Sequence, residues 1–440
     1  MKTAKKLILI IASLTIACMI ILLSCHNRYT GPNKKGIFEE GAGDNGPIPL
    51  AGKGGGLVLA SGYRLPQNSL SQEEQEDYYD PEFNSTVLFA NGKIPALTVT
   101  KSGIILAAAG TSESANYILV KKSSDMGRTW TEVRANYEGF ANMYTHPFFI
   151  NCHNGDVLMG VATTNKAHNE TALYRSTDNG TTWTKQTNIC LSNVASGNNT
   201  SKEETNCFVA FGQGLTLRHG ANANAQKLMF PYYYYGKNSS GNSANQPGTF
   251  AAIMCSEDDG KTFTNSSSYN GSFSSYDPDL VELSDGTVLL SIGVTNSSLK
   301  RFWFKNPNNW NECYDNAEVI DTIHADFVRY EFNGKPIKGT KEALMIYNSR
   351  SHDYNIKMTT NDFNNGAKGG TKYHNEMVLV SGGANSADSY PAITVLPDGT
   401  IATLTDEDNG VVFRRFNLYW LTDGLRNVDY STDLKENFNN

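Results

Sequence analysis

Three similar octets constrain the fold of this chain more than any other feature. They read SSDMGRTW at 123–130, STDNGTTW at 176–183 and SEDDGKTF at 256–263. In each octet an aspartate can accept backbone N–H bonds within a tight turn, and the glycine two positions later can adopt a positive φ. The aromatic residue can close the turn against a core. Each octet therefore predicts a turn between two strands, in which Asp125, Asp178 and Asp258 have structural roles.

Short strand patterns fill the chain between and after the octets. Examples are YILVKKS, DVLMGVAT, KLMFPYYYY, TVLLSIGV, EALMIYN and TIATLTD, and long helical patterns are absent. The segment TNDFNNG, which contains Asp362, is a weaker fourth copy of the octet. Many short strands with a recurring turn motif favour a β-propeller.

The first 25 residues have the layout of a secretory signal. Lysines near the start precede an apolar stretch that ends in LLSC, and this pattern resembles a bacterial lipoprotein cleavage site with Cys25 as the lipidated residue. An uncleaved anchoring helix is the alternative, although the apolar part is short for a full membrane span. Both interpretations place the body of the chain outside the cytoplasm, in the bacterial cell envelope.

The rest of the chain divides by composition. Residues 26–56 are rich in Gly, Asn, Pro and Lys and are expected to form a tether. We expect a propeller at 57–430 and a tail at 431–440. The net charge is −7 and the basic residues are scattered, which argues against nucleic-acid binding.

Cysteine and histidine spacing predicts neither a disulfide framework nor a metal. The cysteines after Cys25 are odd in number, with Cys190 and Cys207 as one candidate pair. No Cys/His cluster has the spacing of a zinc site. No cofactor is predicted, and a monomer is expected.

The octets resemble the Asp-boxes of the sialidase superfamily, whose catalytic domain is a six-bladed β-propeller. KIPALTVTKSGIILA resembles the family's opening Arg-Ile-Pro segment, VELSDGTVLLS and YPAITVLPDGTIATL resemble its Leu-x-Asp-Gly hairpins, and RFNLYWLTDG resembles its closing strand. These segments occur in the family's order. The resemblance implies an all-β, six-bladed propeller that acts on glycans as a retaining exo-glycosidase.

The resemblance also implies a nucleophile and its partner. The family uses a tyrosine nucleophile paired with a glutamate, an exception among glycosidases. Tyr390, in SYPAITVLPDG, falls on the family's tyrosine, and Asp277, in YDPDLVELSDG, falls on the glutamate. A phenol needs a neighbouring base to remove its proton during attack. The structural alternatives are a tyrosine packed beneath a hairpin and an aspartate that caps a turn before Pro278.

The carboxylate clamp departs from the family's pattern of three arginines. Lys93 stands at the first position, Gly293 at the second and Ser351 at the third. Lysine keeps the charge but lacks the planar, two-pronged donor of arginine. Arg301 and Arg350 are the candidates to replace the missing arginines.

Two further carboxylates complete the candidate site. The family's acid/base aspartate lies in a loop that is shortened here to GTSESA, in which Glu113 is the only carboxylate. A lone loop glutamate is often simply solvated, which is the alternative interpretation. Asp406 stands where the family has the glutamate that supports the first arginine.

The sequence is compatible with three functions. The first is a sialidase-type hydrolase of terminal sugars on extracellular glycans, with weak or altered specificity. The second is a non-catalytic, glycan-binding surface lipoprotein, in which Tyr232 to Tyr235 offer sugar-stacking faces. The third is an adhesin or scaffold that uses only the rim of the propeller.

Changing Cys25 to Ala tests the lipid anchor. Without the Cys25 thiol, no acceptor for the lipid remains at the predicted cleavage site, so metabolic fatty-acid labelling of the protein should be lost. Labelling that persists in Cys25→Ala would place the anchor elsewhere.

Overall fold

The computed structural model describes most of the chain after residue 84. The described ranges are 85–111, 118–133, 144–163, 170–186, 189–190, 207–209, 212–236, 248–268, 275–295, 299–305, 313–318, 324–349, 351–364, 374–384, 389–426, 428 and 433–434. Cys25, the predicted signal and the predicted tether lie outside these ranges. Within the described residues, no helix is long and apolar enough to cross a membrane.

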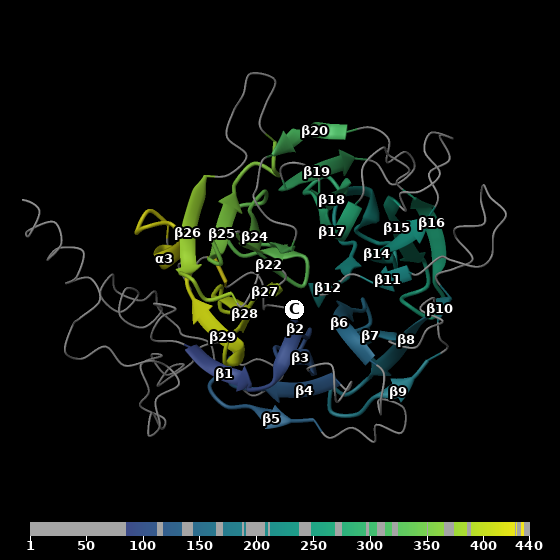
Figure 1. The fold of residues 1–440 in the computed structure, drawn as a ribbon, viewed down its shortest axis with the longest axis horizontal. Helices are drawn as coiled ribbons and strands as arrows, with labels where there is room; N and C mark the ends of the chain where they lie inside the picture. Colours follow the sequence, from purple (N-terminus) through teal and green to yellow (C-terminus); the bar gives the residue numbers. More distant parts are fainter. Residues whose placement is uncertain are drawn as a thin grey trace, which may run out of the picture.

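Antiparallel sheets surround a central axis (Figure 1). Among the described residues, six sheets have four or more strands, and a short hairpin forms a further sheet. This arrangement is a β-propeller, so the predicted all-β propeller is confirmed. Each of the larger sheets has an inner strand next to the axis. The inner strands are β2 (Gly92–Val99), β6 (Tyr144–Asn151), β11 (Cys207–Val209) with β13 (Leu215–Thr216), β17 (Ser275–Glu282), β21 (Ala325–Arg329) and β27 (Pro391–Val395). Between β11 and β13, the short strand β12 (Gly212–Gln213) pairs with β6 of the second sheet.

The outer strands follow the inner strands in chain order in five of the sheets. In the first two sheets they are β3 (Ile105–Thr111), β4 (Ile118–Ser123) and β5 (Thr131–Glu132), then β7 (Val157–Thr163), β8 (Glu170–Ser176), β9 (Thr184–Lys185) and β10 (Ile189–Cys190). The third has β14 (Leu228–Gly236), β15 (Gly248–Ser256) and β16 (Thr264–Ser268), and the fourth has β18 (Val288–Thr295), β19 (Leu299–Lys305) and β20 (Cys313–Glu318). The fifth has β24 (Ala343–Asn348), β25 (Tyr354–Thr359) and β26 (Asn375–Val380).

The sixth sheet closes the ring because it joins the two ends of the described chain. It contains β27, β28 (Ile401–Glu407), β29 (Gly410–Phe416) and β1 (Ser85–Phe89), and β1 pairs antiparallel with β29. The remaining elements are the hairpin of β22 (Glu331–Phe332) and β23 (Lys335–Pro336), a 3₁₀ turn at Gly220–Asn222 and the short helix α3 (Leu418–Leu421).

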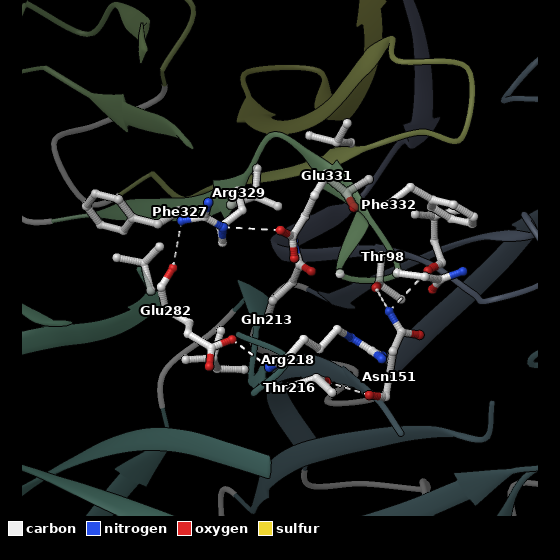
Figure 2. A pocket seen from close by; sticks show the side chains of 18 of the residues that line it. Thr98, Asn151, Gln213, Thr216, Arg218, Glu282, Phe327, Arg329, Glu331 and Phe332 are labelled. Atoms are coloured by element: carbon white, nitrogen blue, oxygen red, sulfur yellow. Dashed lines mark hydrogen bonds and ion pairs between the residues drawn. The ribbon is translucent and has the colours of Figure 1, made fainter. Parts of the chain in front are cut away.

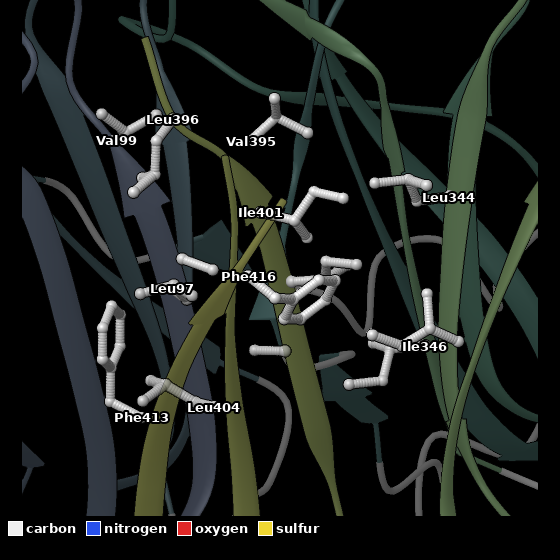
Figure 3. Packing of buried hydrophobic residues seen from close by; sticks show 14 of the residues in the cluster. Leu97, Val99, Leu344, Ile346, Val395, Leu396, Ile401, Leu404, Phe413 and Phe416 are labelled. Carbon is white, nitrogen blue, oxygen red and sulfur yellow. The ribbon is translucent and has the colours of Figure 1, made fainter. Parts of the chain in front are cut away.

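The core lies between neighbouring sheets rather than in one central mass. The inner strand β27 is covered on both faces, because all residues of its sequence PAITV are buried. The largest cluster joins the first, fifth and sixth sheets (Figure 3), where Leu97 of β2, Ile346 of β24 and Phe413 of β29 contribute. Cys152 and Cys255 are free thiols.

The three octets form the same hydrogen-bonded turn at the outer edge of the first three sheets. In the third octet, Asp258 accepts bonds from the backbone N–H of Lys261 at 3.0 Å and of Thr262 at 2.9 Å. The Ser256 hydroxyl accepts from the Gly260 N–H at 2.8 Å, and Gly260 has φ +80°. The equivalent contacts of Asp125 and Asp178 have similar lengths, so all three aspartates hold their own turns.

The weaker fourth copy lies one residue away from the predicted register. Asn361, not Asp362, occupies the aspartate position, because it accepts a bond from the Thr359 hydroxyl at 2.8 Å. Asp362 instead accepts from Arg329 at 3.0 Å in the same sheet and from Ser284 of the preceding sheet. Asp259, which follows Asp258 in the third octet, likewise accepts from the His153 N–H of the preceding sheet at 2.7 Å. The residue after the box position therefore joins neighbouring sheets.

A buried ion pair reinforces the closure of the ring. Arg415 of β29 is fully buried and pairs with Asp398. Its guanidinium also donates to the Thr400 hydroxyl at 2.8 Å and to the carbonyl of Met126, in the first octet, at 3.2 Å. The sixth sheet is thus tied to the first sheet by a charged group with satisfied donors.

Replacing Arg415 by Met should lower the free energy of unfolding by about 3–5 kcal/mol, because it leaves the Asp398 carboxylate buried without its partner. Urea titration measures the loss. Lys338→Met, which breaks a more exposed pair with Asp433, is the control and should cost less than about 1 kcal/mol. Equal losses in the two variants would show that the Arg415 pair does not support closure.

Candidate functional site

The inner strands run in one direction along the axis, so the molecule has two chemically different poles. The parallel pairing of β12 with β6 shows this direction directly. We call the end where the inner strands begin the start pole and the end where they finish the end pole. Lys93, His146, Asp277 and Tyr390 lie at the start pole, since each occurs at or just before the beginning of an inner strand.

A bulge reshapes three inner strands at the start pole. The pairing register shifts near the beginning of β2, β6 and β17. In each bulge a residue other than glycine has a positive φ: Ile94 at 53°, His146 at 50° and Asp277 at 38°. Such conformations are uncommon and, for a β-branched residue, strained. Each residue precedes a proline, which disfavours the right-handed helical conformation, and each bulge re-aims a side chain.

The bulges and strand ends bring a carboxylate, two imidazoles and a phenol together. Asp277 pairs with Nδ1 of His324, the residue before β21, and both side chains are buried. The ring of His324 packs against the ring of Tyr390, with centroids 4.0 Å apart and planes inclined at 45°. His146 approaches Tyr390 edge-on, with centroids 6.0 Å apart. His324 therefore contacts both the carboxylate and the phenol.

Burial controls the charge of His146. Loss of solvation lowers the pKa of its imidazole to about 4, the nearby His324 also lowers it, and the Asp277 carboxylate opposes the change. His146 is therefore neutral near pH 7. A neutral imidazole beside Tyr390 adds no positive charge to the start pole.

Asp279 and Asp326 form a second acidic pair. Asp279 lies in β17, two residues after Asp277, and Asp326 lies in β21, two residues after His324. Burial, and then the negative charge of Asp279, raises the pKa of Asp326 well above its usual value. Asp326 also accepts a bond from the Ile393 N–H at 2.8 Å. Gly212 passes close by with φ +84°, and a Cβ there would lie 3.2 Å from the Asp326 carboxyl. A carboxyl with a raised pKa holds its proton more readily, so the raised pKa of Asp326 reduces the repulsion between the two acids in this layer.

The structure places three of the sequence-predicted residues close to one another. Asp277 and Tyr390 are joined through His324. Asp406 of β28 is buried, and its N–H donates to the Tyr390 carbonyl at 3.1 Å. Lys93 is exposed at the start of β2, and β2 packs against β27 and β28.

The remaining predicted positions are more distant or are not described. Arg301 lies in β19, the third strand of its sheet, opposite the buried Gly293 of β18. Ser351 is exposed in a turn. Glu113 and Arg350 lie outside the described residues.

Sequence reasoning missed His146 and His324. A signal for His146 is present, because an X-Pro pair starts four inner strands: IP in KIPAL, HP in THPFF, DP in YDPDL and YP in SYPAI. Reading these pairs as one repeated feature would have aligned His146 with Asp277 and Tyr390. His324 precedes an alanine and has no such marker.

The fold defines a class of architecture, the β-propellers. The chain resembles the intramolecular trans-sialidase from Ruminococcus gnavus with a TM-score of 0.53 and 13% identity, over 77% of this chain and 98% of that chain. It resembles the α-L-arabinanase from Penicillium chrysogenum with a TM-score of 0.53 and 14% identity, over 84% and 100% of the two chains. These likenesses establish the fold.

One relative is similar to this chain in amino-acid sequence. A sialidase from Micromonospora viridifaciens is 25% identical over 371 residues, which is 76% of this chain and 52% of the relative. The chain thus spans about half the length of that protein. No protein-family model matches the chain. The relative and the trans-sialidase structure confirm the resemblance to the sialidase superfamily that the sequence motifs predict.

The lowered pKa of His146 predicts a pH dependence of stability. Between about pH 6.5 and 4 the unfolded chain binds a proton at this residue and the folded chain does not, so acidification destabilises the fold. From pH 7 to 4.5 the contribution is on the order of 2 kcal/mol.

His146→Asn should remove this contribution, because asparagine does not titrate and tolerates a positive φ. Urea titrations of both proteins at pH 7 and 4.5 measure the effect. The variant should lose less stability on acidification than the wild type. An identical loss in the two proteins would contradict the assignment.

Proposed function

We propose that the chain is a retaining exo-glycosidase of sialidase type that acts at the start pole on terminal sugars of extracellular glycans. The observation that carries this proposal is the contact of the Tyr390 ring with His324, which is itself paired with Asp277. We take the six larger sheets as the six blades of the propeller. The likeness to the Micromonospora sialidase supports a glycosidase function.

Tyr390 is the proposed nucleophile. Its phenolic oxygen attacks the anomeric carbon while the bond from that carbon to the leaving-group oxygen breaks. The phenolic proton passes to His324, which acts as the base and whose ring contacts the ring of Tyr390. Asp277 orients the imidazole and stabilises the imidazolium that forms. Water then attacks the glycosyl–tyrosine bond, releases the sugar and restores the phenol.

A general acid must protonate the leaving oxygen in the first step. Glu113 is the proposed acid because it is the only carboxylate in the shortened loop 110–115 that follows the second strand of the first sheet. The same residue would remove a proton from the attacking water in the second step.

The clamp predicts weak or altered specificity toward sialic acid. Lys93 presents a point charge where the family has a planar fork, and Gly293 and Ser351 present no cation. Each bidentate contact to a carboxylate that is lost removes on the order of 1.5–3 kcal/mol of binding. A neutral or differently charged terminal sugar fits this pole better, and Arg301 and Arg350 remain the proposed replacements for the arginines. The arabinanase of similar fold is complexed with arabinobiose, a neutral sugar.

A non-catalytic glycan-binding protein is the second candidate, and the same incomplete clamp favours it. The proposed location is common to both functions: the chain is anchored by lipid at Cys25 and displayed in the bacterial cell envelope. Turnover of a panel of aryl glycosides separates the two candidates, because a binding protein retains its ligand without releasing the aryl group.

Tyr390→Phe should reduce turnover of whichever aryl glycoside is cleaved by at least about 10³-fold, because only the nucleophilic oxygen is removed. Binding of the product sugar should change little. Tyr419→Phe, on α3, is the control and should keep wild-type turnover. Full activity in Tyr390→Phe would show that another group is the nucleophile.

A further inference from the structure

A cavity lies at the end pole, away from the site described above (Figure 2). Residues near the ends of the inner strands line it, including Thr98 of β2, Asn151 of β6, Thr216 of β13 and Glu282 of β17. The five residue steps from Lys93 to Thr98 span about 17 Å in an extended strand. The two poles therefore present separate surfaces, and the proposed glycosidase makes no use of this cavity.

Arg218 extends its side chain into this cavity (Figure 2). The residue follows β13, and its backbone N–H donates to Glu282 at 2.6 Å. Its aliphatic stem lies across Gly334 in the turn between β22 and β23, where an added Cβ would be 2.6 Å from the Arg218 Cδ. Gly334 also has φ +77°. Glycine at position 334 therefore leaves room for the Arg218 side chain, and any larger residue there would collide with it.

The acidic groups around the cavity already have partners. Glu282 accepts from the N–H groups of Arg218 and His219 and from Asn222. Glu331 pairs with His219 Nε2 at 2.8 Å and with Arg329 Nε at 3.1 Å.

Arg329, the second arginine that lines the cavity, also has partners. Arg329 donates to Asp362 at 3.0 Å and to the carbonyls of Glu282 and Thr340. Its charge is therefore used within the fold.

The Arg218 guanidinium differs from these groups. Within the described part of the chain, no hydrogen bond or ion pair involves its side-chain nitrogens, and Figure 2 shows the guanidinium beside Asn151 without such a contact. Burial lowers its pKa, while the charges of Glu331, Asp259 and Glu282 oppose the change. An arginine remains protonated under such conditions. Its five donors thus face the cavity in a partly desolvated setting.

We propose that the end-pole cavity binds a small monocarboxylate through the Arg218 guanidinium. The planar fork of arginine matches the two oxygens of a carboxylate. The volume is about 120 Å³, comparable to the ~150 Å³ engineered cavity that holds benzene, so an anion of a few heavy atoms fits. The carboxylates of Glu282 and Glu331 repel a dianion more than a monoanion, which favours a carboxylate over phosphate.

Titration of the purified full chain with lactate tests the proposal, with lactamide and inorganic phosphate as comparison probes and ligand-observed NMR as the readout. Lactate should bind more tightly than either probe. Arg218→Gln should weaken lactate binding at least tenfold, and Arg218→Lys should weaken it less because the charge is kept. Lys93→Gln and Tyr390→Phe alter the start pole and should leave lactate binding unchanged, so this test is independent of the proposed glycosidase.

Arginine-directed labelling of the wild-type protein gives a second measurement that needs no variant. Lactate should protect Arg218 from phenylglyoxal, as read by peptide mass mapping, and lactamide should not. The proposal would be overturned by no lactate binding to the wild type, by unchanged binding to a folded Arg218→Gln protein, or by loss of binding in Lys93→Gln. Preferential binding of phosphate would also overturn it.

Discussion

The pairing of β1 with β29 is the constraint on which the rest of the structure depends. It joins the start of the described chain to the last strand of the propeller and leaves no open gap between the first and sixth sheets. Arg415 strengthens the junction by linking Asp398 to the backbone of the first octet. The closed ring places the inner strand of each larger sheet next to the central axis (Figure 1). Closure therefore decides which residues meet at each pole, although those residues are far apart in sequence.

The two poles use this arrangement differently. At the start pole, three bulges with positive φ at Ile94, His146 and Asp277 disturb the strands where they begin. The bulge at Asp277 places its carboxylate against His324, whose ring contacts the ring of Tyr390. At the end pole, charged groups of the described residues meet in a network that gives Glu282, Glu331 and Asp362 their partners. The proposed chemistry and the proposed carboxylate binding therefore use opposite ends of the same scaffold.

The sequence predicts the repeated parts of this molecule better than the parts that join repeats. An octet encodes its own turn, so the roles of Asp125, Asp178 and Asp258 follow from local hydrogen bonding. Tyr390 and Asp277 could be placed at one pole because similar hairpins follow both. His324 could not be found in this way, since its contacts cross two sheet boundaries and no local pattern marks it. The same limitation applies to Arg218, because its role depends on the acids around it having other partners. It also applies to Asp362, because the aspartate position of the fourth copy is occupied by Asn361 and the register could not be recognised from the sequence.

The most direct test of the account is to trap the glycosyl–enzyme intermediate. Fluorinated glycosyl fluorides of an acidic and of a neutral sugar slow the second step more than the first, so a covalent adduct should accumulate and can be located by peptide mass mapping. The account predicts an adduct on Tyr390 with at least one of the sugars, and its loss when His324 is changed to Ala. An adduct on another residue, or no adduct with any sugar, would contradict the assignment of the start pole as a retaining glycosidase site.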